Sequence, residues 1–521
     1  MGIQGIMKAW IYKYRLQVSV AFIMLLAAFM RFYQLDSLPP GLHPDEAANG
    51  LDVFKILEQQ DFRAFYSTNG GREALFFYLQ SIGVLLFDNT ILGLRVAPAL
   101  LGTLAVGAVY LWASSWFGRR AGLIAALLMA VTPWAVIISR DGFRAGMIML
   151  IVPLSLWLYT KAFQTNKKIW FVLAGVSLGL GFYTYIAYRM LPAALVAIAL
   201  YILIFRRGWI GKWWKSLALS AVALIITLIP IGIYAIQYPA DIAGRPGGVS
   251  FTNPDLNGGK PVQTLIDTTF KTALMFNISG DENYRHNLGG QPAFNIFVGI
   301  MFLLGVIVAL ARIKRLSYFA LLMVFGAMLL PEVLTAEGIP HFLRAIGALP
   351  AAVVLAAIGI TFLLAKWYQT FPLNSVARTS GAVAVAFLLA LTVYQGYVAY
   401  FVAWANATET YDAYAEDAVE MAKFYNNSGF DGKRYAVSGD YSMQTVNFLT
   451  HGKATFDLVD PSNVDKIALD PGVSKEFTIF VNDKEKVIKR LQLKFPDGQL
   501  SPYYSPFTGE ELFVVYTVKS K

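Results

Sequence analysis

Cysteine is absent from this chain of 521 residues. Its absence excludes a disulfide framework, a thiolate nucleophile and a cysteine-based metal site. Charged residues are also scarce, at 15% of the chain, whereas hydrophobic residues make up 56% and the mean hydropathy is +0.52. A soluble protein of this length needs far more polar surface. The apolar residues instead fall in runs long enough to span a bilayer, which takes about 20 residues per helix. The sequence therefore predicts a mainly α-helical, polytopic membrane protein.

Acidic residues are missing from every segment that we assign to the cytoplasm. All charged residues of these segments are lysines and arginines. The six segments are 1–16, 117–120, 161–168, 206–215, 311–316 and 366–380. Such an asymmetry follows the positive-inside rule. We therefore attribute the net charge of +10 to topology and contact with anionic lipid, and expect no nucleic acid partner.

Eleven apolar runs are predicted to cross the membrane, with the N-terminus in the cytoplasm. They are 17–33, 92–116, 121–138, 147–164, 169–187, 191–206, 215–236, 295–312, 316–333, 344–366 and 381–404. The run 73–87 is apolar too, but a span there would invert every later loop and place Arg119 and Arg120 outside. We expect it to be a helix lying at the outer interface, and 260–276 to be a second one. No small-residue cleavage site follows the first run, which predicts an uncleaved helix.

The predicted organisation is a transmembrane domain, 1–404, followed by a soluble domain, 405–521. The outer loops are 34–91, 139–146, 237–294 and 334–343. An odd number of spans places the tail outside, where alternating strand-like and helical runs predict a small extracytoplasmic α/β domain. Its predicted helices are 411–425 and 484–493, and its predicted strands are 434–438, 454–459, 476–481 and 511–519. The tail has no Gly-rich phosphate loop, so we interpret it as a cap or docking module.

The first outer loop contains His43-Pro44-Asp45-Glu46. Pro44 followed by Asp45 is typical of a helix start, and a carboxylate there is stabilised by helix amides and dipole without any further role. The functional interpretation makes Asp45 a general base that takes a proton from an attacking hydroxyl or amine. The other ionisable groups on the same membrane face favour the second interpretation.

Arginines collect on the outer side beside histidines and carboxylates. Arg72-Glu73 is expected to open the interfacial helix, and Arg140-Asp141 and Arg144 lie in a very short loop. Arg285-His286-Asn287 lies in the long loop, and His341 and Arg344 come before the tenth span. Snorkelling of helix-end arginines would explain them structurally. The functional interpretation is an anion site, because guanidinium groups match phosphate oxygens in a bidentate way. The head of a polyprenyl phosphate would lie at this depth.

The histidines and carboxylates of the outer side could also bind a metal ion. Histidines and carboxylates on one side could hold a divalent ion, but the chain has no H-E-x-x-H motif and no D-x-D pair. We therefore expect no required metal and no other cofactor.

With these residues placed, the chain resembles the membrane-embedded GT-C glycosyltransferases, most of all the group of protein O-mannosyltransferases and bacterial aminoarabinose transferases. The resemblance covers residues 1–160 best, and the stretches YRHNLGGQP (284–292) and HFLRAIGALP (341–350) resemble a bacterial or archaeal subgroup. Its motifs are the Asp-Glu pair, the charged start of the interfacial helix, Phe117-Gly118-Arg119-Arg120, Pro133-Trp134 and Ser139-Arg140. Aminoarabinose transferases carry Glu-Lys-Pro where this chain has Arg72-Glu73-Ala74, which weakens a phosphate role for Arg72. The Trp-Trp-Asp-Tyr-Gly signature of oligosaccharyltransferases is absent, which argues against whole-glycan transfer.

The resemblance implies an inverting transferase that uses a polyprenyl-monophosphate sugar in the cell membrane. By position, Asp45 matches the family's base for the acceptor, and Glu46 would position the acceptor or support Asp45. Arg140 and Arg144 would match residues near the donor phosphate. The other predicted phosphate-binding residues are Arg72, Arg285 and Arg344. The predicted substrate-binding residues are His43, Glu73, Asp141, His286, Asn287 and His341. A protein hydroxyl, a glycolipid and a polysaccharide all remain open as acceptors.

Two other classes compete with an enzyme. A transporter or flippase for a lipid-linked or anionic substrate would place ionisable residues near the bilayer midplane, often with inverted repeats. Here the charged residues lie at loop ends on one face, and no repeat is evident. A non-catalytic receptor or assembly subunit with the same fold is the third class.

Overall fold

Helices dominate the computed structural model, which describes residues 3–439, 441, 443–470 and 472–520. Eight helices within these residues are long and apolar enough to cross a membrane, or nine if one bent pair counts as a single span. They are Tyr14–Phe32, Ile91–Phe117, Arg144–Thr165, Ile186–Phe205, Arg207–Gln237, Leu316–Val333, Phe342–Thr370 and Ser375–Trp404, with the bent pair Arg119–Val131 and Pro133–Arg140. Nine predicted spans are thus matched. The remaining two coincide with shorter helices, α8 (Lys168–Gly181) and α14 (Ile296–Ala311), so their crossing stays a prediction.

The third predicted span, 121–138, is not one straight helix as expected. It consists of α5 (Arg119–Val131) and α6 (Pro133–Arg140), which meet at an angle of 58°. Pro133 is the first residue of α6, and proline has no amide hydrogen and disfavours a helical residue before it. The chain therefore turns at Thr132.

The apolar run after the first outer loop forms α3 (Leu75–Phe87), but Arg72 and Glu73 do not open it as we expected. They form strand β2, which pairs antiparallel with β1 (Phe65–Tyr66). Gly70 and Gly71 lie at φ of 75° and 85° in the connecting turn, a region where glycine is favoured because it lacks a Cβ. The second predicted interfacial helix is confirmed as a helix, α13 (Pro261–Leu274).

The described residues fall into two compact units. The first contains the residues up to Tyr33, with Phe62–Phe76 and Val96–Trp404. The second contains Gln34–Asp61, Phe77–Arg95 and the residues from Ala405 onward. One boundary lies at residue 404, where the sequence predicts the change from membrane bundle to tail.

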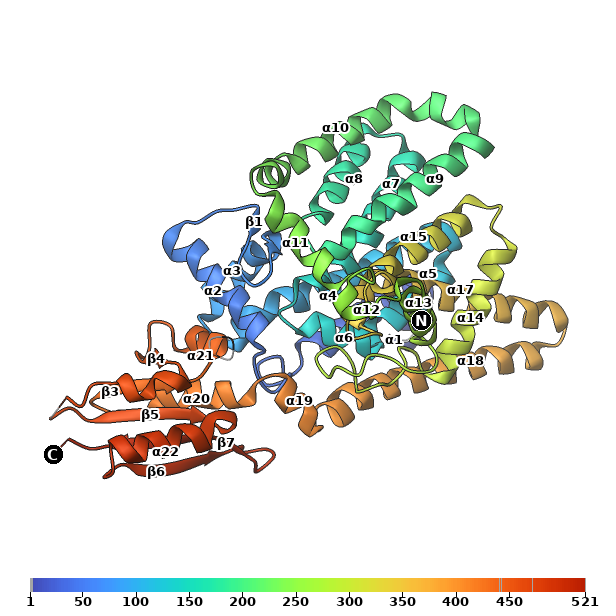
Figure 1. Ribbon diagram of the computed structural model, residues 1–521. Coiled ribbons are helices and arrows are strands. Elements are labelled where there is room, and N and C mark those ends of the chain that lie inside the picture. Colours follow the sequence, from blue (N-terminus) through green and yellow to red (C-terminus); the bar gives the residue numbers. More distant parts are fainter. Residues whose placement is uncertain (1–2, 440, 442, 471, 521) are drawn as a thin grey trace. The chain divides into compact units, whose positions relative to one another are not determined.

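The first unit is a helical bundle around α17 (Leu349–Thr370), whose residues 349–360 are all buried. Helix α14 packs so closely on it that a Cβ at Gly305 would lie 1.8 Å from the carbonyl oxygen of Leu355. Helices α7 (Ile148–Thr165), α8, α9 (Leu191–Phe205) and α10 (Arg207–Gln237) lie side by side in a second group (Figure 1). Helix α15 (Leu316–Val333) packs against α9.

The tail has the predicted α/β architecture. Its five-stranded sheet has the order β4-β3-β5-β7-β6, with β3 parallel to β4 and β5, and β7 antiparallel to β5 and β6. The strands are β3 (Lys433–Val437), β4 (Asp457–Val459), β5 (Lys475–Phe480), β6 (Gln499–Tyr504) and β7 (Glu511–Val518). Helix α22 (Lys484–Lys494) contributes to one hydrophobic core of the tail, and α20 (Glu416–Asn427) and α21 (Met443–Thr450) to another.

Three details of the tail differ from the prediction. The expected helix 411–425 is divided into α19 (Thr408–Ala413) and α20. Helix α21 was not predicted, because its eight residues hold too little periodicity. Strand β6 was missed because it is an edge strand, exposed along its whole length and containing Pro502, so it lacks the alternation of a half-buried strand.

Candidate functional site

The predicted base begins a helix of the second unit, α2 (Pro44–Gln59). Nδ1 of His43 accepts a hydrogen bond from the Asp45 amide at 3.1 Å, and Oε1 of Glu46 accepts one from the His43 amide at 3.3 Å. This capping box satisfies two amides that the first helical turn cannot. His43 and Glu46 therefore both stabilise the start of α2, and their predicted contact with substrate stays a prediction.

A buried ion pair secures the start of α2. Arg95, in α4 (Ile91–Phe117), donates from Nε and Nη2 to the two carboxylate oxygens of Glu46, at 3.0 Å each, and both side chains are inaccessible to solvent. The same guanidinium donates to the carbonyl oxygens of Pro39 and Gly41 at 2.8 and 2.5 Å. Bidentate pairing and carbonyl partners offset the cost of burying both charges. Glu46 therefore supports the loop that carries Asp45.

Asp45 keeps access to solvent at this secured helix start. Its side chain is 32% exposed, and its Oδ1 accepts a hydrogen bond from the Tyr441 hydroxyl at 2.6 Å. The segment after Tyr441 is attached to the same loop, because the Thr445 hydroxyl donates to the carbonyl oxygen of Leu42 at 2.7 Å. The Asp45 carboxylate is thus both accessible and held in place by a tyrosine hydroxyl.

In the first unit, one carboxylate is shared by two arginines. Oε2 of Glu73 lies 2.9 Å from Nε of Arg144, and Oε1 lies 3.5 Å from Nη2 of Arg189. Arg144 also donates to the carbonyl oxygen of Gly71 at 3.2 Å and lies over the Tyr185 ring. Glu73 is buried, whereas 26% of the Arg189 side chain is exposed. The cluster has two positive charges and one negative, so it has net charge to offer an anion.

Two of the predicted phosphate-binding arginines are buried and donate hydrogen bonds to oxygen atoms of the protein itself. Arg140 is fully buried at the end of α6 and donates to the carbonyl oxygens of Met30 and Tyr33 at 3.1 and 2.8 Å. Arg72 is also buried and donates from Nη2 to the Thr68 hydroxyl at 2.9 Å. Asp141 follows Arg140 and is fully buried. These placements favour a structural role for both arginines.

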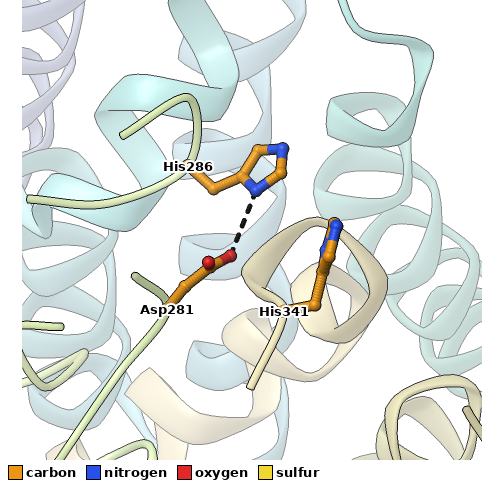
Figure 2. Close-up of side chains that lie close together, drawn as sticks. All are labelled: Asp281, His286 and His341. Atoms are coloured by element: carbon orange, nitrogen blue, oxygen red, sulfur yellow. Dashed lines mark hydrogen bonds and ion pairs between the residues drawn. The ribbon is translucent and has the colours of Figure 1, made fainter. Parts of the chain in front are cut away.

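The histidines of two outer segments come together around Asp281 (Figure 2). Nδ1 of His286 lies 3.1 Å from Oδ2 of Asp281, and the rings of His286 and His341 are 4.6 Å apart. Asp281 also accepts from the amides of Phe342 and Asn283, at 2.7 and 2.8 Å. Asn287 closes the loop by donating to the carbonyl oxygens of Asp281 and Gln291. Each residue offers one possible ligand atom, and the three atoms lie within 4.8 Å of one another.

The surroundings of His341 favour its neutral form, in which a ring nitrogen can bind a cation. Burial raises the pKa of the Asp281 carboxyl, and burial followed by the charges of His286 and Arg344 lowers the pKa of His341. Nδ1 of His341 is buried and has no hydrogen-bond partner among the described residues. Glu332 fixes the backbone of His341 by accepting from its amide at 2.7 Å. Two imidazoles and a carboxylate are ligands that Zn²⁺ and similar ions accept.

The histidine group lies beside the arginine cluster. The ring of Phe143, the residue before Arg144, is 6.2 Å from the ring of His286. Arg285 donates to the Asn283 side chain at 3.2 Å, and Arg344 pairs with Glu337 at 3.0 Å. A chain of contacts in the first unit thus runs from Glu73 and Arg144, through Phe143, to His286 and His341. His43, Asp45 and Glu46 belong to the second unit.

Several residues of the site were not predicted from the sequence. They are Arg95, Arg189, Asp281, Glu332 and Tyr441. Arg95 and Glu332 lie inside predicted spans, where a charged side chain requires a partner. Their position in an apolar run could therefore have indicated that each forms a buried polar contact. No pattern in the sequence pointed to Tyr441 or to the contact of Asp281 with the His341 segment, because these partners are 396 and 61 residues apart.

We expect Arg95→Met to destabilise the protein by about 3–5 kcal/mol, because Glu46 would remain as a buried carboxylate without its cation. The free energy of unfolding, measured by detergent-denaturant titration of the purified protein, checks this. The double variant Arg95→Met/Glu46→Met should recover part of the loss. The control Arg120→Met, at an exposed arginine, should change little, and an equal loss there would contradict the assignment.

We expect chelator-treated protein to take up one Zn²⁺ ion at Asp281, His286 and His341, measured by metal analysis after dialysis. His286→Gln and His341→Gln should each weaken binding by at least about tenfold, since each removes a ligand. His451→Gln is the matched control, because this exposed histidine pairs with Glu58. Unchanged uptake in the His286→Gln/His341→Gln double variant would show that this group does not hold the ion.

Comparisons with known proteins agree with this architecture. The model of the dolichyl-phosphate-mannose-protein mannosyltransferase family matches residues 74–233. YkcB of Bacillus subtilis (strain 168), whose name assigns it provisionally to the mannosyltransferases, is 29% identical over 288 residues, which are 54% of this chain and 37% of YkcB. The chain thus spans little more than a third of that relative.

Two solved structures share the fold over nearly the whole chain. ArnT from Cupriavidus metallidurans, bound to undecaprenyl phosphate, has a TM-score of 0.56 and 14% identity, with 96% of this chain and 97% of that chain covered. The oligosaccharyltransferase AglB from Archaeoglobus fulgidus, with an inhibitory peptide and a dolichol-phosphate, has a TM-score of 0.55 and 17% identity, covering 97% and 74%. This chain is therefore a multi-pass membrane protein with the GT-C fold, similar to the dolichyl-phosphate-mannose-protein mannosyltransferases.

Proposed function

We propose that the chain is an inverting glycosyltransferase that moves a sugar from a polyprenyl-monophosphate donor to an acceptor at the outer membrane face. The similarity to mannosyltransferases and the GT-C fold support the reaction class. The ArnT and AglB structures hold undecaprenyl phosphate and dolichol-phosphate, which are polyprenyl phosphates, and this supports the donor class. The acceptor is a protein, a glycolipid or a polysaccharide.

The cluster of Glu73, Arg144 and Arg189 is the observation that carries the proposal. Its two guanidinium groups share one carboxylate, so a positive charge remains for a phosphate group. Guanidinium donors match phosphate oxygens, and their charge offsets the negative charge that grows on the leaving phosphate. His286, Asn287 and His341, with Arg285 and Arg344, lie on the same unit and complete the substrate-binding set.

Asp45 acts as the general base in this proposal. Its carboxylate takes the proton of the acceptor hydroxyl or amine while the acceptor atom attacks the anomeric carbon of the sugar. The bond from that carbon to the phosphate oxygen breaks as the new bond forms, and the polyprenyl phosphate leaves as an anion. No covalent sugar–enzyme intermediate is needed, because this leaving group is stable. Alignment of both substrates supplies much of the rate.

The membrane orientation follows from the charge asymmetry. The N-terminus and the basic segments lie in the cytoplasm, and residues 405–521 lie outside. The competing class, a transporter, finds less support because the ion pairs described above lie at helix ends and in loops. Turnover separates the two classes, because a transporter breaks no glycosidic bond.

We expect Asp45→Asn to lower kcat by about 10²–10⁴-fold, because the amide cannot accept the acceptor proton. Transfer from radiolabelled polyprenyl-phosphate sugars into membranes containing the protein measures this. The donor KM should change little. Glu58→Gln, on the same helix and half exposed, is the matched control. Equal kcat for Asp45→Asn and wild type, in equally expressed samples, would remove Asp45 from the reaction.

We expect Arg189→Gln to raise the donor KM by about tenfold or more, because a charge-assisted hydrogen bond to phosphate is lost. The acceptor KM should stay unchanged, and Arg189→Lys should recover part of the donor affinity by keeping the charge. Arg490→Gln in the tail, where the side chain is exposed, is the control. Unchanged donor KM in Arg189→Gln would place the phosphate elsewhere.

A further inference from the structure

An apolar cavity of about 680 Å³ lies in the first unit, among α7, α8, α9, α10 and α15. Its deep wall includes Leu178, Leu195 and Ile198, and its volume is in the range of small-molecule sites, roughly 300–1,000 Å³. The residues at its shallow end come from helix ends, with Gln164 near the end of α7 and Leu316 at the start of α15. The helix group that encloses it is the one in which α7 to α10 lie side by side (Figure 1).

Aromatic side chains at the shallow end of the cavity indicate that this end lies at the depth of the lipid headgroups. Trp209 and Phe163 both line the cavity, and their rings are 4.6 Å apart. Trp213 lies 6.3 Å from Trp209, and Trp157 lies 5.9 Å from Trp170. Tryptophan is enriched at membrane–water interfaces. These helix ends adjoin segments 161–168, 206–215 and 311–316, whose charged residues are all basic, so the interface is the cytoplasmic one.

Four exposed cations form a collar next to this end of the cavity. The collar consists of Arg206, Arg207, Lys314 and Arg315, and among the described residues none of them forms an ion pair. The two halves of the collar are joined, because the Tyr201 hydroxyl, in α9, donates to the carbonyl oxygen of Lys314 at 2.5 Å. The Tyr201 and Phe319 rings also stack at 4.6 Å.

An apolar cavity that reaches helix ends beside cations without ion pairs matches one kind of molecule. A phospholipid supplies an acyl chain for the cavity and a phosphate for the collar, and basic pockets between transmembrane helices select anionic headgroups. We propose that this cavity binds an anionic phospholipid of the cytoplasmic leaflet, with one acyl chain among α7, α9, α10 and α15 and the phosphate at the collar. The site is separate from the proposed donor site, which uses residues assigned to the outer face.

Binding at this place would link α9 to the turn before α15. A ligand that binds only the folded protein raises its stability in proportion to its occupancy. The bound lipid therefore stabilises the contact between α9 and the turn before α15, in which the Tyr201 hydroxyl donates to the carbonyl oxygen of Lys314, whether or not the protein is turning over.

The test titrates detergent-purified, delipidated full-length protein with palmitoyl-oleoyl phosphatidylglycerol or the matched phosphatidylcholine, and counts bound lipid by native mass spectrometry. Wild type is expected to bind the anionic lipid at least about tenfold more tightly. Neutralising Arg206, Arg207, Lys314 and Arg315 to Gln should remove this preference, since each surface cation contributes about fivefold. Ala199→Trp, at an exposed residue lining the cavity, should block binding of both lipids.

The matched control is Lys366→Gln/Arg378→Gln, at exposed cations of another cytoplasmic segment, and it should bind as wild type does. Melting curves of the lipid-free variants show that each is folded, and the charge variant tests the proposal even where Ala199→Trp is unstable. Equal affinity of wild type for the two lipids, or an undiminished preference in the charge variant, overturns the proposal. Displacement of the anionic lipid by equimolar undecaprenyl phosphate also overturns it, because the cavity would then hold the donor's carrier.

Discussion

A charge inside a lipid bilayer needs a partner, and this constraint determines how the polar groups of the chain are arranged. Arg31, Arg95 and Arg140 are fully buried, and each guanidinium donates to oxygens of the protein. Arg31 donates to the carbonyl oxygens of Ala130 and Met129, close to the bend at Pro133, where the chain changes direction. These contacts satisfy charges that lipid could not.

The same constraint explains why the candidate site consists of small ionic groups at helix ends. Glu46 pairs with Arg95, whereas the Asp45 side chain beside it is 32% exposed. Glu73 is matched by Arg144 and Arg189 together, so one positive charge is left over. In the function proposed above, Asp45 takes the proton of the acceptor and the surplus positive charge binds the phosphate.

A second surplus of positive charge lies in segments that contain no acidic residues. Segments 161–168, 206–215 and 311–316 carry cations and no acidic residues, and they adjoin helix ends that line an apolar cavity. Anionic lipid headgroups attract such cations. The charge bias from which we predict the topology is therefore also the basis of the proposed lipid site.

Local composition was enough to predict nine of the spans and the α/β character of the tail, because the burial of apolar runs acts on each segment by itself. The helix start at Pro44 could also be predicted from the sequence, because its capping partners lie within three residues of one another. Only the tertiary structure decided that Arg95 pairs with Glu46, that Arg189 pairs with Glu73, and that His341 lies beside Asp281. The physical reason is distance along the chain: a partner 49, 116 or 60 residues away leaves no periodic signal, and only packing selects it.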